Sequence, residues 1–96
     1  MKCTVIYATP DAVFRVDLLL DADATAGDAL VAARAQWRSS EPKLASKLDW
    51  DHAPIGVFGR RCDRAARLSD GDRVEIYRAL SLDPKQQRRR RAQLRR

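Results

Sequence analysis

The most constraining feature of the sequence is an acidic turn followed by an alternating stretch. Asp70-Gly71-Asp72 has the residue types of a tight turn. Between Arg73 and Ala79 the apolar residues Val74 and Ile76 alternate with polar ones. A period of two places one set of side chains on each face of a strand. We therefore expect a strand with one buried face near the end of the patterned part of the chain.

The first twenty residues show the same alternation twice. Residues 2–8 are rich in β-branched and aromatic side chains, and Thr9-Pro10-Asp11 interrupts them. Residues 13–20 then resume the alternation. Two such runs around a short turn signal predict a β-hairpin.

A single strong helix signal follows the hairpin. Thr25 is a favourable N-cap, and Asp28 places a carboxylate at the positive end of the helix. Apolar residues recur on one face from Ala26 to Trp37. The pattern predicts one amphipathic helix over about 26–37.

The segment between this helix and the last strand is less regular. Ser39-Ser40-Glu41-Pro42 ends the helix, and Leu44 and Leu48 fit one further helical turn. A short strand is expected at 55–58, and a basic linker without regular structure after it.

The resulting order is ββαββ, an α+β chain with a mixed four-stranded sheet. This is the layout of the β-grasp, in which the helix covers one sheet face and the first and last strands pair in parallel. The side chains expected against the helix are Cys3, Val5, Tyr7, Phe14, Val16, Leu18, Val57, Val74 and Ile76. Those expected on the open face are Thr4, Ile6, Arg15, Asp17, Arg73, Glu75 and Tyr77.

Charge divides the chain into two parts. Residues 1–80 have twelve Lys and Arg against twelve Asp and Glu, whereas residues 81–96 have seven against one, so the net charge of +6 lies in the second part. We expect a β-grasp domain over 1–80 and a basic, flexible C-terminal tail over 81–96.

Three segments resemble the RnfH family of small bacterial ubiquitin-like proteins: VIYATPD, PIGVFGR and GDRVEIYRALSLDPKQQRRRR. Ala79 stands where the family pattern usually has proline. The resemblance implies a ubiquitin-like fold and protein partners, linked in some bacteria to the Rnf electron-transport complex and in others to a proposed toxin. It transfers no contact residues to this sequence.

Carrier chemistry is not expected. Ubiquitin-type modifiers and sulfur carriers of this fold work through a C-terminal Gly-Gly, which an activating enzyme must thread into its site. The four glycines of this chain, at 27, 56, 59 and 71, include no pair.

We therefore predict a non-enzymatic protein-interaction module that uses no cofactor. Tyr and Arg are enriched among residues that dominate binding energy at interfaces. On the open face these are Arg15, Arg73 and Tyr77, which we predict to bind a protein partner.

The tail is predicted to add electrostatic reach. Its cationic residues are Lys85, Arg88, Arg89, Arg90, Arg91, Arg95 and Arg96. Without aromatic residues for base stacking, any nucleic-acid contact would be to phosphate. A solvated end, contact with an acidic protein, and an RNA- or ribosome-associated role led by the tail all remain open.

Other candidates are weaker. Asp49, Asp51 and His52 fall within one loop, where a solvated polar loop is favoured over a metal site, so we predict no metal. Cys62 has arginine neighbours that could lower its thiol pKa, although a free unreactive thiol is the favoured interpretation. Cys3 and Cys62 lack the pattern of a disulfide scaffold, which favours a cytoplasmic location.

Overall fold

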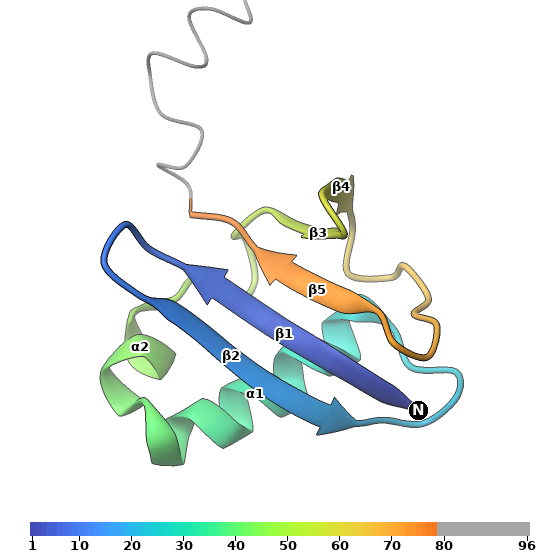
Figure 1. Cartoon of the computed structure of the whole chain (residues 1–96), viewed down its shortest axis with the longest axis horizontal. Coiled ribbons are helices and arrows are strands. Elements are labelled where there is room, and N and C mark those ends of the chain that lie inside the picture. Colours follow the sequence, from blue (N-terminus) through green and yellow to red (C-terminus); the bar gives the residue numbers. More distant parts are fainter. Residues whose placement is uncertain (79–96) are drawn as a thin grey trace, which may run out of the picture.

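The computed structural model describes residues 1–78, which form a five-stranded mixed sheet with one main helix across one face (Figure 1). The elements are β1 (Lys2–Ala8), β2 (Val13–Leu19), α1 (Ala26–Ser40), α2 (Pro42–Lys47), β3 (Ile55–Val57), β4 (Arg60–Cys62) and β5 (Arg73–Ile76). The strand order is β2-β1-β5-β3-β4. β1 pairs in parallel with β5, and the other neighbours are antiparallel. The predicted β-grasp arrangement is confirmed.

The prediction of four strands was wrong, because β4 forms where we expected an irregular linker. Residues 60–62 read Arg-Arg-Cys, which lacks the apolar alternation that marks a strand. In the structure all three residues are exposed or half-buried. Their pairing comes instead from the hairpin turn at Phe58 and Gly59. β5 also ends at Ile76, earlier than the sequence suggested, and Ala79 lies outside the described residues.

Helix α1 begins where the sequence predicts. The Thr25 hydroxyl accepts from the Asp28 N–H at 3.2 Å, and the Asp28 carboxylate accepts from the Thr25 N–H at 2.9 Å. This reciprocal capping box satisfies two backbone donors at the helix start. The helix runs three residues beyond Trp37, and the N–H of Glu41 then donates to the Trp37 carbonyl at 2.7 Å. α2 follows at once, with Pro42 in its first turn.

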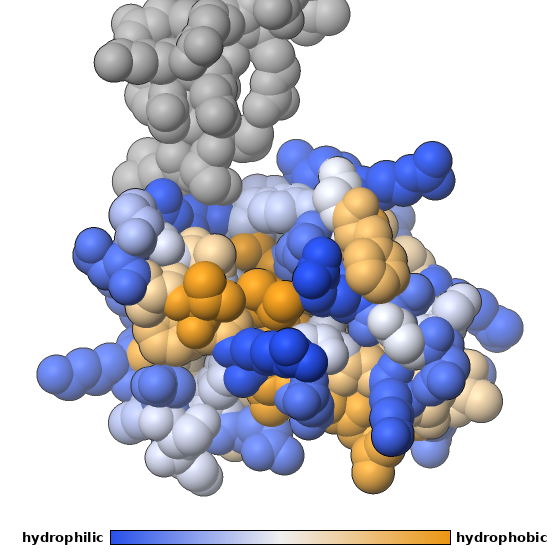
Figure 2. Space-filling model, in the orientation of Figure 1, coloured by the Kyte–Doolittle hydropathy of each residue, from blue (hydrophilic) through white to orange (hydrophobic). Residues whose placement is uncertain are grey.

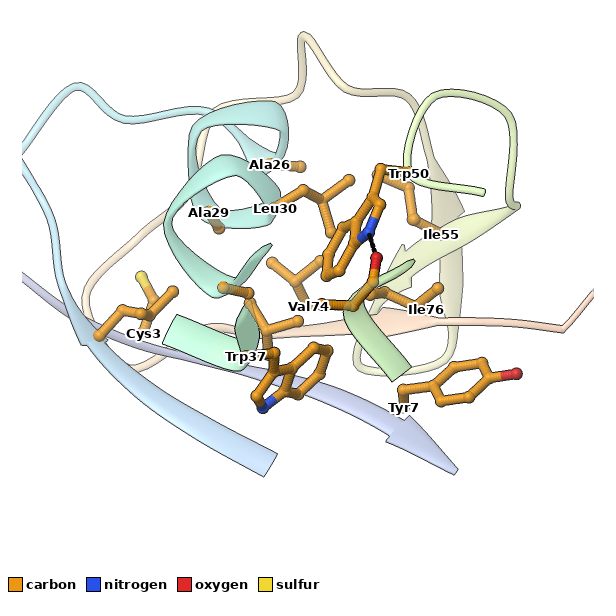
Figure 3. Close-up of a cluster of buried hydrophobic side chains, with 14 of the residues drawn as sticks. Cys3, Tyr7, Ala26, Ala29, Leu30, Trp37, Trp50, Ile55, Val74 and Ile76 are labelled. Carbon is orange, nitrogen blue, oxygen red and sulfur yellow. Dashed lines mark hydrogen bonds between the residues drawn. The ribbon is translucent and has the colours of Figure 1, made fainter. Parts of the chain in front are cut away.

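The hydrophobic core lies between the sheet and α1 (Figure 3). Val5, Ile55 and Val74 are less than 2% exposed, and the predicted facing of β1 and β5 is confirmed. Phe14, Val16 and Val57 face the same side but are only partly buried.

Trp50 was not predicted as a core residue, yet it is 8% exposed and lies 5.8 Å from Trp37 between ring centroids. Its indole N–H donates to the Ala45 carbonyl at 2.8 Å. The loop that contains the candidate metal ligands Asp49, Asp51 and His52 is therefore anchored to the core by Trp50. Among residues 1–78, no helix is long and apolar enough to cross a membrane.

Candidate interaction surface

The sheet face opposite α1 is uncovered in the described chain and holds the predicted binding residues. Register places one cross-strand row over all five strands: Arg15, Ile6, Glu75, Gly56 and Arg61. A second row, next to the first, contains Asp17, Thr4 and Arg73. We call this side of the sheet the open face.

The open face has an exposed aromatic side chain that the sequence analysis missed as a site residue. Phe58 is 56% exposed, and the Arg73 guanidinium carbon lies 5.3 Å from its ring centroid. Phe58 and Gly59 link β3 to β4 with φ angles of 49° and 82°. Positive φ at both positions is what a type I′ hairpin turn requires, and Asn-Gly is the sequence that suits it. A bulky residue in this conformation is strained by about 1 kcal/mol or more.

Glu75 anchors the β3–β4 turn, the corner of the open face that contains Phe58. Its Oε1 accepts from the Gly59 N–H at 2.8 Å and from the Tyr77 hydroxyl at 2.7 Å. Its Oε2 lies 3.6 Å from Nε of Arg73. The carboxylate thus ties the β3–β4 turn to β5, and it forms an ion pair with Arg73, the cation beside Phe58.

Tyr77 lies over β3, directly beyond the end of β5. A Cβ on Gly56 would stand 2.6 Å from the Tyr77 hydroxyl oxygen, so glycine is needed there for the ring to pack. Burial and the hydrogen bond to Glu75 raise the pKa of Tyr77 to about 12. The hydroxyl is therefore a firm donor at neutral pH.

Arg15 belongs to the other end of the sheet. Its Nε lies 3.2 Å from Oδ1 of Asp17, which also accepts from the Thr4 hydroxyl at 2.9 Å. The hydrogen bonds from Thr4 and Arg15 hold the pKa of Asp17 below its usual value. The structure therefore brings Arg73 and Tyr77 together around Glu75, whereas Arg15 lies on β2, with β1 between it and β5.

Most of the large exposed apolar side chains of residues 1–78 lie on the open face, although they do not form one patch. Of the four large exposed hydrophobic residues among residues 1–78, Val13, Leu19 and Phe58 lie on this side. Figure 2 shows this face with apolar regions over the β1–β2 hairpin and at the β3–β4 corner, separated by hydrophilic side chains.

The remaining sequence candidates do not assemble into a second site. Burial and Asp63 raise the pKa of the Cys62 thiol despite Arg61 and Arg64. This contradicts the alternative of a lowered pKa, whereas the favoured interpretation was a free unreactive thiol. His52 contacts Asp49, with Nδ1 3.1 Å from Oδ1, on an exposed loop. Within residues 1–78 no three His, Cys, Asp or Glu side chains are grouped as metal ligands. The predicted tail residues, from Lys85 to Arg96, lie outside the described residues, as does the predicted domain boundary at 80.

Solved structures share this arrangement. The crystal structure of SAMP1 from Haloferax volcanii matches with a TM-score of 0.63 and 22% identity, covering 84% of this chain and 98% of that one. A putative molybdopterin converting factor, subunit 1, from Pyrococcus furiosus matches with a TM-score of 0.55 and 22% identity, covering 80% and 95%. At this identity the likeness shows the fold alone, and the class of protein that it defines is the β-grasp.

Sequence relatives define the family within that class. The family model described as RnfH family Ubiquitin matches residues 1–91, and the chain belongs to the RnfH family. The protein RnfH of Halorhodospira halophila is 43% identical over 90 residues, covering 92% of this chain and 84% of that protein. A UPF0125 protein of Chromobacterium violaceum is 44% identical over 93 residues, covering 97% and 87%. The resemblance expected from the sequence is confirmed.

Proposed function

We propose that this protein is a non-enzymatic, cytoplasmic interaction module that binds a protein partner through the open face. The observation that supports this most is the exposed Phe58 in a left-handed backbone conformation. A strained bulky residue at a turn where asparagine would be relaxed suggests that the aromatic ring serves binding rather than stability.

The chemistry around Phe58 fits a binding anchor. Aromatic and arginine side chains at the centre of an interface contribute most of its energy. Tyr77 is held by a 2.7 Å hydrogen bond to Glu75, so ordering it costs little entropy on binding, and Arg73 forms an ion pair with the same carboxylate at 3.6 Å.

The expected partner has an apolar pocket with an acidic rim. The carboxylates of Glu75 and Asp17 on the open face already accept hydrogen bonds from this chain's own side chains or backbone. The arginines of this face are therefore the charged groups that a partner would meet. Arg61 and Arg73 on the same face are exposed, and they would complement acidic groups around a pocket for Phe58.

The decisive variant is Phe58→Asn. Asparagine tolerates positive φ, so we expect the free energy of unfolding to rise by about 1 kcal/mol. Partner affinity should instead fall by at least about tenfold, as for loss of an interface anchor. A pull-down from the native organism identifies the partner, and titration calorimetry with that purified protein measures the affinity.

The matched control is Val31→Asn, which removes an exposed apolar side chain from α1, on the other side of the sheet. It should leave affinity unchanged. Equal affinity of Phe58→Asn and the unmodified chain would contradict the proposal.

The basic tail supports a second candidate function, contact with RNA phosphates, because residues 81–96 have the whole net charge of +6. Binding of this kind weakens steeply as salt increases. Filter binding to generic RNA over a salt series, with and without residues 81–96, tests it.

A further inference from the structure

The free edge of β2 is the longest unpaired strand edge in the described chain. β2 ends the sheet on one side with seven residues, whereas β4 ends the other side with three. Unpaired N–H and C=O groups along such an edge favour pairing with another strand.

The hydrogen bonds to β1 identify which groups face outward. Leu20 donates to the Met1 carbonyl at 2.9 Å, and the Ala12 carbonyl accepts from Thr9 at 2.8 Å. In an antiparallel pair this direction alternates along the strand, so the even-numbered residues of β2 bond to β1. The outward backbone groups belong to Val13, Arg15, Asp17 and Leu19.

The same four residues have their side chains on the open face, in a pattern that is symmetric in polarity and antisymmetric in charge. Val13 and Leu19 are 69% and 81% exposed, and between them stand Arg15 and Asp17, with side chains 62% and 71% exposed. The order is apolar, positive, negative, apolar. Reversing the strand direction therefore sets each residue against one that complements it.

We propose that a second copy of this chain pairs with this edge, antiparallel, β2 to β2, about a two-fold axis at Val16. Arg15 of each copy then lies opposite Asp17 of the other, and Val13 lies opposite Leu19. Opposite charges and apolar pairs in direct cross-strand positions each stabilise such pairing.

Charge selects this register over its neighbours. Shifting the second strand by two residues in one direction sets Arg15 against Arg15, and in the other direction sets Asp17 against Asp17. Like charges directly opposite each other destabilise a sheet. The even-numbered side chains agree with the same register, since Val16 meets Val16 and Phe14 meets Leu18.

The pairing would bury apolar surface that the monomer leaves accessible. Phe14 and Val16 are only partly covered by the core. Two five-stranded sheets would become one continuous sheet with both α1 helices on the same side. The two Phe58 corners would remain at its outer ends, so the partner site and the self-pairing edge are separate.

Charge reversal tests the proposal through sedimentation equilibrium over a concentration series. In a dimer of the Arg15→Asp variant, the new carboxylate of each copy faces the native carboxylate of Asp17 in the other. In a dimer of the Asp17→Arg variant, the new guanidinium faces the native one of Arg15. Each single variant should self-associate about tenfold more weakly than the unmodified chain, given the energy of two lost cross-strand pairs.

Mixing the two single variants should restore association, because the two carboxylates on the edge of the Arg15→Asp copy then meet the two guanidinium groups on the edge of the Asp17→Arg copy. The double variant, Arg15→Asp with Asp17→Arg, should also dimerise like the unmodified chain. Circular dichroism confirms that each variant is folded.

Arg34→Asp on α1 matches the charge change of Arg15→Asp away from the edge, and it should leave association unchanged, as should Phe58→Asn. An unmodified chain that stays monomeric at every concentration overturns the proposal. So does a dimer that the single variants leave intact or that their mixture fails to restore.

Discussion

At the residue scale, Glu75 shows how one side chain on a polar strand face organises its neighbours. Its carboxylate joins Gly59, Tyr77 and Arg73 through contacts of 2.8, 2.7 and 3.6 Å. Alternation in the sequence correctly places Glu75 on the open face. The hydrogen bonds depend on the β3–β4 turn, which is distant in sequence, so no local pattern indicates them.

Tyr77 makes the stability of the fold depend on pH in the alkaline range. Its pKa is raised to about 12 in the folded state, above its ordinary value of 10.0. Because the folded state holds the phenolic proton more tightly, the stabilisation is fully present below pH 10 and is lost as pH rises toward 12.

We expect Tyr77→Phe to be less stable at neutral pH but to lose less stability over that alkaline range. Urea unfolding at a series of pH values measures both effects. Parallel curves for the two proteins would show that Tyr77 is not the titrating group.

At the element scale, the facing of β5 determines which substitutions the fold tolerates. Ile76 is 5% exposed in the core, whereas Glu75 lies on the open face. An unpaired carboxylate buried at Ile76 costs several kcal/mol, comparable with the stability of a small domain.

Ile76→Asp should therefore unfold the domain. Glu75→Lys should remain folded with a loss of about 2 kcal/mol, from the acceptors that Gly59 and Tyr77 lose. Thermal melts followed by circular dichroism distinguish the two. If Glu75→Lys lost more thermal stability than Ile76→Asp, the assignment of buried and open faces along β5 would have to be reversed.

Most elements could be predicted from the sequence because each has a local signal. Thr25 and Asp28 marked the start of α1, and the alternation along residues 2–8 and 13–20 marked the hairpin. The residues of β4 themselves give no strand signal, since Arg60 and Arg61 are exposed polar residues. Phe58 and Gly59, directly before β4, were the available clue to a tight hairpin. The same dipeptide could have indicated the exposed anchor.

At the scale of the whole molecule, the tail and the body are predicted to be independent. Residues 81–96 have the entire net charge and no apolar periodicity after Pro84. Deleting them should change the free energy of unfolding by no more than about 0.5 kcal/mol, which chemical denaturation measures. Loss of folding on deletion would mean that this segment packs against the sheet.

The parallel pairing of β1 with β5 has a consequence for folding during synthesis. β1 occupies residues 2–8 and its neighbour β5 residues 73–76, so the centre of the sheet joins the first and last strands of residues 1–78. Until residue 76 has emerged, one edge of β1 has no neighbour and the face of Val5 lacks part of its cover. Contacts so distant in sequence form late and slowly. A nascent chain stalled before β5 therefore exposes an open edge of the β1–β2 hairpin, which favours pairing with other strands until synthesis resumes.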